Sequence, residues 1–275
     1  MTVGVDALLR AALRDWRAAS RDALRGNARR GDVHAWRIAT RRLLALADAG
    51  LEPAASRRIE RELRRAFRAS GKLRDAQVGI DLARAMAPAD PCALGLASWL
   101  RHRVPRWRRR LLVRLAEVER RRVSRIVERD LPTSRPDIEA RGALAFERCD
   151  AALRKVRTRR ARLTLASPPS DSHRLRVAVK RARYLSEAVA RLPRGVRYAA
   201  TARALARQQR ALGEVADLAV LQDRLAQFAR RHPGDAGEAQ VFGRALRRRQ
   251  VASFRQALRS FPADPVAAHR RKSGT

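Results

Sequence analysis

Two stretches of the sequence nearly repeat each other. Residues 34–42 read HAWRIATRR and residues 173–181 read HRLRVAVKR, so histidine, arginine, a β-branched residue and two consecutive bases recur 139 residues apart. A second pair follows in the same order, because residues 70–78 (SGKLRDAQV) and 212–220 (LGEVADLAV) share glycine, aspartate and valine at matching positions. Two matches in one order indicate that the chain contains an internal duplication.

Around these stretches the sequence favours helices. Ala, Leu, Arg and Glu dominate, aromatic residues make up only 4%, and no segment alternates as strands do. Gly and Pro divide the chain into eight predicted helices. They cover about residues 6–25, 32–50, 53–86, 90–130 (with a kink near Pro105), 137–165, 171–192, 195–231 and 236–261. We therefore expect an all-α fold.

The duplication also predicts the domain organisation. Residues 131–136 (LPTSRP) form a proline-rich linker between two sets of four helices. We expect a single domain over residues 1–265, built of two repeats at about 1–132 and 136–262. Residues 263–275 should form a loose C-terminal tail.

The repeated stretches place basic residues on one face of a helix, because positions i, i+3 and i+7 share a face. These residues are His34, Arg37 and Arg41, flanked by Arg42, and His173, Arg176 and Lys180, flanked by Arg181 and extended by Tyr184. The opposite faces are apolar in both copies, with Trp36, Ala39, Leu43 and Leu46 in the first and Leu175, Ala182, Leu185 and Val189 in the second. Each helix should therefore bury one side and present a row of cations on the other.

Such a row suits a ligand with repeating phosphates. Arginine offers a planar fork of donors that can bridge phosphate oxygens, and successive bases lie about 5 Å apart along the helix axis. A basic face can also be merely solvated. Solvation alone does not require the same residue types at the same offsets twice, so the repeat favours a binding role.

The overall charge points to the same class of partner. Lys and Arg number 63 against 27 Asp and Glu, which gives a formal net charge of +36. An acidic partner would relieve the self-repulsion of such a chain. Nucleic acid, an anionic membrane and a phosphate polymer all fit, whereas cationic substrates are disfavoured.

The second pair of motifs places glycine and aspartate in helical sequence. Gly71 and Gly213 each cost a helix about 1 kcal/mol relative to alanine, so a close helix contact or a kink is expected there. Asp75 and Asp217 stand among many bases, and we expect each to pair with arginines and hold them in place. Arg74 lies next to the first of them.

Other sequence features argue against catalysis and export. Cys92 and Cys149 are too few for a disulfide framework or a zinc site, and they fit a reducing compartment. The N-terminus lacks the apolar core of a signal peptide, and no run approaches the roughly 18 apolar residues of a membrane span. Glycine-rich phosphate loops and nucleophile–base pairs are also missing. We expect a cytoplasmic protein that is not an enzyme, with no cofactor, no metal and no membrane segment.

The ordered pair of motifs resembles the CHAD domain family over about residues 6–262. This resemblance implies two four-helix bundles related by pseudo-twofold symmetry, which bind inorganic polyphosphate through a basic channel or surface and in some members associate with polyphosphate granules. The expected polyphosphate contacts are His34, Arg37, Arg41, Arg42, His173, Arg176, Lys180 and Arg181, then Arg74, Arg183 and Tyr184, with Asp75 and Asp217 as supporting residues. The second repeat departs from the first in two places, having Ala216 for Arg74 and Leu212 for Ser70.

Two other functions remain open on the sequence. A nucleic-acid-binding protein would carry a similar charge, although aromatic residues for base stacking are scarce and nucleic acid should bind only weakly or non-specifically. A polyphosphate-processing enzyme would need clustered carboxylates to hold metal ions, and the acids here are scattered among arginines.

Overall fold

The computed structural model describes residues 4–118, 120–131 and 135–261, and within these residues it contains helices and no strand. The α-helices are α1 (Val5–Arg25), α2 (Arg30–Gly50), α3 (Pro53–Met86), α4 (Cys92–Ala116), α5 (Arg120–Arg129), α6 (Arg135–Ala161), α7 (Pro169–Val189), α8 (Arg197–Ala229) and α9 (Ala236–Arg259). Two short 3₁₀ helices, η1 (Ala87–Ala89) and η2 (Pro233–Asp235), precede α4 and α9. The predicted all-α fold is confirmed.

The fourth predicted helix is two helices in the structure. α4 runs on through Pro105 and ends at Ala116, and α5 begins at Arg120. The intervening turn brings the buried residues Val123 and Val127 of α5 into one apolar cluster with α1 and α3. A single helix to residue 130 is therefore wrong, because burial of α5 requires the chain to turn.

The predicted linker is shorter than expected, since α6 begins at Arg135 rather than after residue 136. Residues 132–134 and the predicted tail over 263–275 lie outside the described residues.

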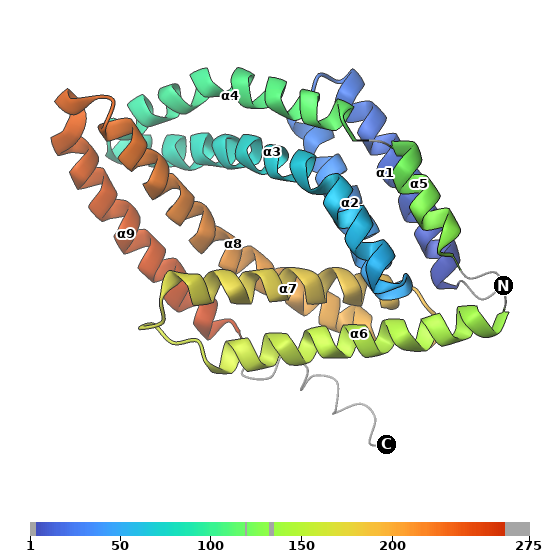
Figure 1. Ribbon diagram of the computed structural model, residues 1–275. Coiled ribbons are helices and arrows are strands. Elements are labelled where there is room, and N and C mark those ends of the chain that lie inside the picture. Colours follow the sequence, from blue (N-terminus) through green and yellow to red (C-terminus); the bar gives the residue numbers. More distant parts are fainter. Residues whose placement is uncertain (1–3, 119, 132–134, 262–275) are drawn as a thin grey trace.

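Helices pack in the same order in the two halves of the chain (Figure 1). In the first half α1 packs on α2 and α3 packs on α4, and in the second half α6 packs on α7 and α8 packs on α9. Across the halves, α2 contacts α7 and α3 contacts α8. The two helices that carry the first repeated motif therefore meet each other, and so do the two that carry the second.

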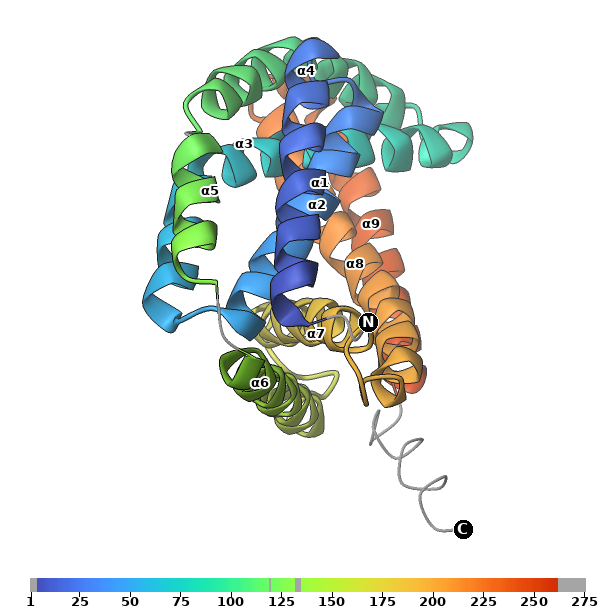
Figure 2. The ribbon, with the colours of Figure 1, turned by 90° about the vertical axis from the view of Figure 1, so that its right-hand side faces the viewer.

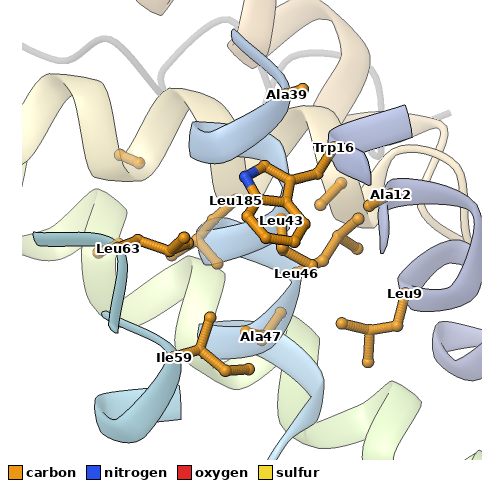
Figure 3. Close-up of a cluster of buried hydrophobic side chains, with 14 of the residues drawn as sticks. Leu9, Ala12, Trp16, Ala39, Leu43, Leu46, Ala47, Ile59, Leu63 and Leu185 are labelled. Carbon is orange, nitrogen blue, oxygen red and sulfur yellow. The ribbon is translucent and has the colours of Figure 1, made fainter. Parts of the chain in front are cut away.

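Two apolar clusters hold the helices together. The larger one joins α1, α2, the first half of α3, the end of α4 and α5 with α6, α7, the first half of α8 and the end of α9. Figure 3 shows its centre, where Trp16 of α1, Leu43 of α2, Ile59 of α3 and Leu185 of α7 come together. The smaller cluster combines the C-terminal half of α3 and the start of α4 with the C-terminal half of α8 and the start of α9, through residues such as Leu96. Both clusters therefore contain residues from both halves.

Each long helix of the second motif passes from one cluster to the other. On α3 the larger cluster ends at Leu73 and the smaller one begins at Ile80, and on α8 the change falls between Leu212 and Leu218. Arg74 and Asp75 lie in the first interval, and Gly213 and Asp217 lie in the second. Polar side chains are thus placed where the two apolar clusters meet and α3 contacts α8.

Arginines of α6 also secure the C-terminal end of α2, which Figure 2 shows above α6. Arg148 donates to the carbonyl oxygens of Asp48 and Leu51, each at 2.8 Å, and Arg141 donates to that of Gly50 at 2.8 Å. These carbonyls have no partner within their own helix. Part of the basic excess is therefore used to join the two halves.

Among the described residues, no helix is both long and apolar enough to cross a membrane.

Candidate functional site

Three helices bring five cations together where the halves meet. Arg37 and Arg41 come from α2, Arg74 from α3, and Arg176 and Lys180 from α7; we call these five residues the central cluster. Each member lies within electrostatic reach of others on a different helix.

The apolar faces of α2 and α7 orient the central cluster. All eight residues that the sequence predicts for these faces are buried, with Trp36 and Leu43 on α2 and Leu185 on α7 wholly inaccessible. Because that side of each helix packs into the core, the i, i+3, i+7 row points the other way.

Arg37 is the most deeply placed cation, with only 9% of its surface exposed. Its Nη1 donates to Ser70 Oγ at 2.5 Å, and its guanidinium lies over the Phe67 ring at 4.9 Å from the centroid. Burial, together with the charges of Arg41 and Arg74, lowers the pKa of Arg37 to about 10.

Arg41 lies between two aromatic rings. Its guanidinium is 5.4 Å from the centroid of Phe67 and 6.0 Å from that of Tyr184, and its Nη1 is 3.4 Å from the Tyr184 hydroxyl. Such cation–π contacts stabilise a guanidinium without neutralising it. Arg41 therefore keeps its charge available to a ligand.

Arg74 joins the two halves through Asp217 of α8. Its Nη1 and Nη2 donate to the two carboxylate oxygens at 2.5 and 2.8 Å, and its Nη1 lies 3.4 Å from Asp75. Burial lowers the pKa of Arg74, but the hydrogen bonds and charge of Asp217 and the charge of Asp75 outweigh it, and the pKa is raised. The equivalent arginine is missing from the second half, where Ala216 stands.

The second half also lacks a partner for Arg176. Ser70, which accepts from Arg37, is replaced by the buried Leu212 at the matching place. Arg176 Nε is buried with no hydrogen-bond partner among the described residues, and burial lowers the pKa of Arg176. At least one N–H group of this arginine is therefore free to donate a hydrogen bond to a ligand.

Lys180 shows the largest shift in pKa within the central cluster. Burial, followed by the charges of Arg176, Arg41, Arg74 and Arg37, lowers the pKa of Lys180 to about 7. A lysine in such surroundings loses its proton readily, and a nearby anion would restore it.

The remaining predicted contacts lie outside the central cluster. His34, Arg42 and His173 are exposed, without a hydrogen bond or ion pair in the described structure. Arg181 forms an ion pair across the halves with Asp48, with Nε–Oδ2 and Nη2–Oδ1 distances of 2.8 and 3.0 Å. Arg183 pairs with Glu187 at 2.7 Å and lies over the Tyr184 ring.

The two glycines of the second motif do not mediate a close helix contact. A methyl group at Gly213 would meet nothing within 4 Å, and one at Gly71 would meet only Arg37 Nη1, at 3.9 Å. The expected close contact is therefore wrong. At Gly71 the missing side chain instead leaves space beside a member of the central cluster.

The arrangement is suited to holding an anion with several charged oxygens. The five cations of the central cluster have only two carboxylates beside them in the described structure, those of Asp75 and Asp217. Arg37 and Arg41 contact aromatic rings instead of further acids. Within the described residues, no three His, Cys, Asp or Glu side chains gather closely enough to hold a metal ion.

Comparisons with known proteins agree with this architecture. A model of the CHAD domain matches residues 7–226. The crystal structure of the CHAD domain from the plant Ricinus communis superposes with a TM-score of 0.71 at 21% sequence identity, and the alignment covers 94% of this chain and 91% of that one. No curated protein sequence matches. With four-fifths of its residues matched by the family model, the chain belongs to the CHAD domain family.

Proposed function

We propose that this protein binds inorganic polyphosphate at the central cluster, without catalysing a reaction on it. The CHAD domain family is associated with polyphosphate binding in general. The observation that carries the proposal is the proximity of five cations that are buried or half-buried. Burial first, and then mutual repulsion, lowers the pKa values of Lys180 and Arg37, and an anion placed among these cations would relieve the repulsion.

The geometry favours a linear phosphate chain over other polyanions. Arg41 of α2 lies within electrostatic reach of Arg176 and Lys180 of α7, which are about one helical turn apart, so successive phosphates of one chain could contact donors of both halves. Unstacked bases would need aromatic platforms. Phe67 and Tyr184 are already covered by Arg37, Arg41 and Arg183.

The exposed His34, Arg42 and His173 would extend the contact surface around the central cluster, and Arg181 would do so after leaving Asp48. A protein with these properties would remain in the cytoplasm and associate with polyphosphate granules.

Competition binding tests the proposal. Long-chain polyphosphate should bind the protein at physiological salt and resist displacement by single- or double-stranded nucleic acid at equal charge concentration. Affinity should fall steeply with salt, since binding releases counterions. Displacement by nucleic acid would assign the site to that ligand, and steady release of orthophosphate with Mg²⁺ or Mn²⁺ would show an enzyme.

The perturbed lysine predicts a dependence of binding on pH. Because free Lys180 has a pKa of about 7 and bound phosphate raises it, binding above pH 7 must take up a proton. Affinity should fall between pH 7 and 9 by at most about tenfold per pH unit. Titrations at constant ionic strength measure this. K180R keeps the charge at every pH used, so it should remove the dependence; an unchanged profile in K180R would contradict the assignment.

A further inference from the structure

A second basic surface lies on the first half of the molecule, away from the central cluster. A groove between α3, the end of α4 and α5 encloses a hollow of about 560 Å³. Its basic residues are Arg58, Arg61, Arg65, Arg114 and Arg122, and we call it the α3–α5 groove. Two acids, Glu62 and Glu117, share the lining, so the groove keeps an excess of positive charge.

The arginines that α3 contributes to this groove have no hydrogen-bond or ion-pair partner among the described residues. Arg58, Arg61 and Arg65 are exposed, and none makes a hydrogen bond or ion pair with the described residues. By contrast, Arg114 is paired with Glu117 at 2.6 Å. Unpaired guanidinium groups crowded along one helix repel each other, and an anion in the groove would relieve that repulsion.

A row of arginines connects the groove with the central cluster. Arg57, Arg61, Arg64 and Arg68 follow each other at spacings of three and four residues, so they share one face of α3, and all four are exposed. The next position on this face is Gly71, where the only nearby group is Arg37 Nη1. From Arg61 to Arg74 the rise along α3 is about 20 Å.

The second half repeats this surface only in part. At the matching places, 142 residues later, α8 keeps arginine at Arg203, Arg207 and Arg210, but it has alanine at three positions, which are Ala199, Ala200 and Ala206. Lys72 is replaced by Glu214. The matching face of α8 therefore has three arginines fewer than α3 and one acid in place of a base.

From this asymmetry we infer that a long phosphate chain leaves the central cluster in one direction, over Gly71 and along α3 into the α3–α5 groove. The inference rests on the proposed function, because the chain must first be held at the central cluster. On this inference the two halves of the protein contribute unequally to binding, because the phosphate chain extends over the first half only. The inference also adds that long chains gain affinity over short ones through contacts made only on the first half.

Two triple variants test the inference with the same loss of charge. R58A/R61A/R65A removes the three arginines that α3 contributes to the groove, and R203A/R207A/R210A removes three exposed arginines from α8. Alanine is the strongest helix former, so both variants should fold, and circular dichroism checks this. At physiological salt the Debye length is about 8 Å, so distant charges contribute little through the general field.

The groove variant should bind long-chain polyphosphate at least about tenfold more weakly than the unaltered protein, with a salt slope smaller by about two. Its affinity for tripolyphosphate, which is too short to leave the central cluster, should stay unchanged. The α8 variant should retain both affinities. Equal losses in the two variants would overturn the one-directional path, because net charge or contacts on both halves would then explain the effect. No loss in the groove variant would show that the chain does not enter the groove.

The same titrations separate this inference from the proposed function. If neither polyphosphate binds the unaltered protein, the proposed function fails; if both bind and the groove variant is unaffected, only the path along α3 fails. A groove variant that loses affinity for nucleic acid alone would overturn the inference and assign the groove to that ligand.

Discussion

Replacing Arg41 with Gln and Lys180 with Met should weaken polyphosphate binding at least about hundredfold. Each replacement removes a charge-assisted hydrogen bond to phosphate, worth about 1.5–3 kcal/mol, and about 1.4 kcal/mol corresponds to a factor of ten. Met keeps nearly the length of Lys, and Gln is shorter than Arg but retains a polar end. Isothermal titration with long-chain polyphosphate at physiological salt measures the change.

This loss should occur without a loss of stability. The lowered pKa of Lys180 means that its charge opposes folding, so the double variant should unfold at the same denaturant concentration as the unaltered protein or at a higher one. R10A/R14A removes two exposed charges from the outer helix α1 and serves as the control, with little change in binding expected. Normal binding by R41Q/K180M, or equal weakening in the control, would contradict a role for the central cluster.

Replacing Asp217 with Asn should have the largest effect on stability. The change removes the carboxylate that holds Arg74 at 2.5 and 2.8 Å and leaves a half-buried guanidinium beside four other cations. Loss of this partly buried pair should lower the free energy of unfolding by about 2–3 kcal/mol. Denaturation by urea at low salt measures the change.

The cause of that loss can be checked with a second substitution and with the ligand. R74M in the D217N background should recover much of the lost stability, because it removes a half-buried charge that has lost its bidentate partner. Polyphosphate should stabilise D217N more than it stabilises the unaltered protein, since its oxygens take the place of the missing carboxylate. If D217N is as stable as the unaltered protein, or if R74M brings no recovery, Asp217 does not hold the site together.

Features that depend on a single helix could be predicted from the sequence. Because residues three and four apart share a face, the positions of Arg37, Arg41, Arg176 and Lys180 follow from helical periodicity alone. The all-α fold follows from composition and from the scarcity of breakers. Periodicity also indicates correctly that Trp36 and its neighbours are buried.

Contacts between helices could not be predicted from the sequence. The sequence predicts that Asp217 pairs with arginines, but only the structure shows that its partner is Arg74 of the other half. The ion pair of Arg181 with Asp48 is another contact across the halves that spacing within one helix cannot reveal. The turn between α4 and α5 was missed because the need to bury Val123 and Val127 arises only from packing.

Two substitutions between the repeats acquire meaning only in three dimensions. The hydroxyl of Ser70 accepts a hydrogen bond from Arg37. Leu212, at the matching place, has no hydroxyl to offer Arg176, and Arg176 Nε has no hydrogen-bond partner among the described residues. Ala216 leaves Asp75 without the bidentate arginine that Asp217 has. The arginine of the first motif copy is therefore hydrogen-bonded, whereas the matching arginine of the second copy has a free donor within the described structure. In an alignment of the two repeats, this chemical difference is visible only as mismatched residues.

The contact between Arg74 and Asp217 also has a consequence for synthesis of the chain. During translation, α1 to α3 leave the ribosome long before α8 does, so Arg74 and its neighbours spend that interval without their internal carboxylate. A nascent segment this basic is surrounded by ribosomal RNA, whose phosphates attract it. Arrival of Asp217 completes the junction of the halves and withdraws Arg74 from such competition. One aspartate supplied late by the second half therefore neutralises Arg74 only after both halves have been made.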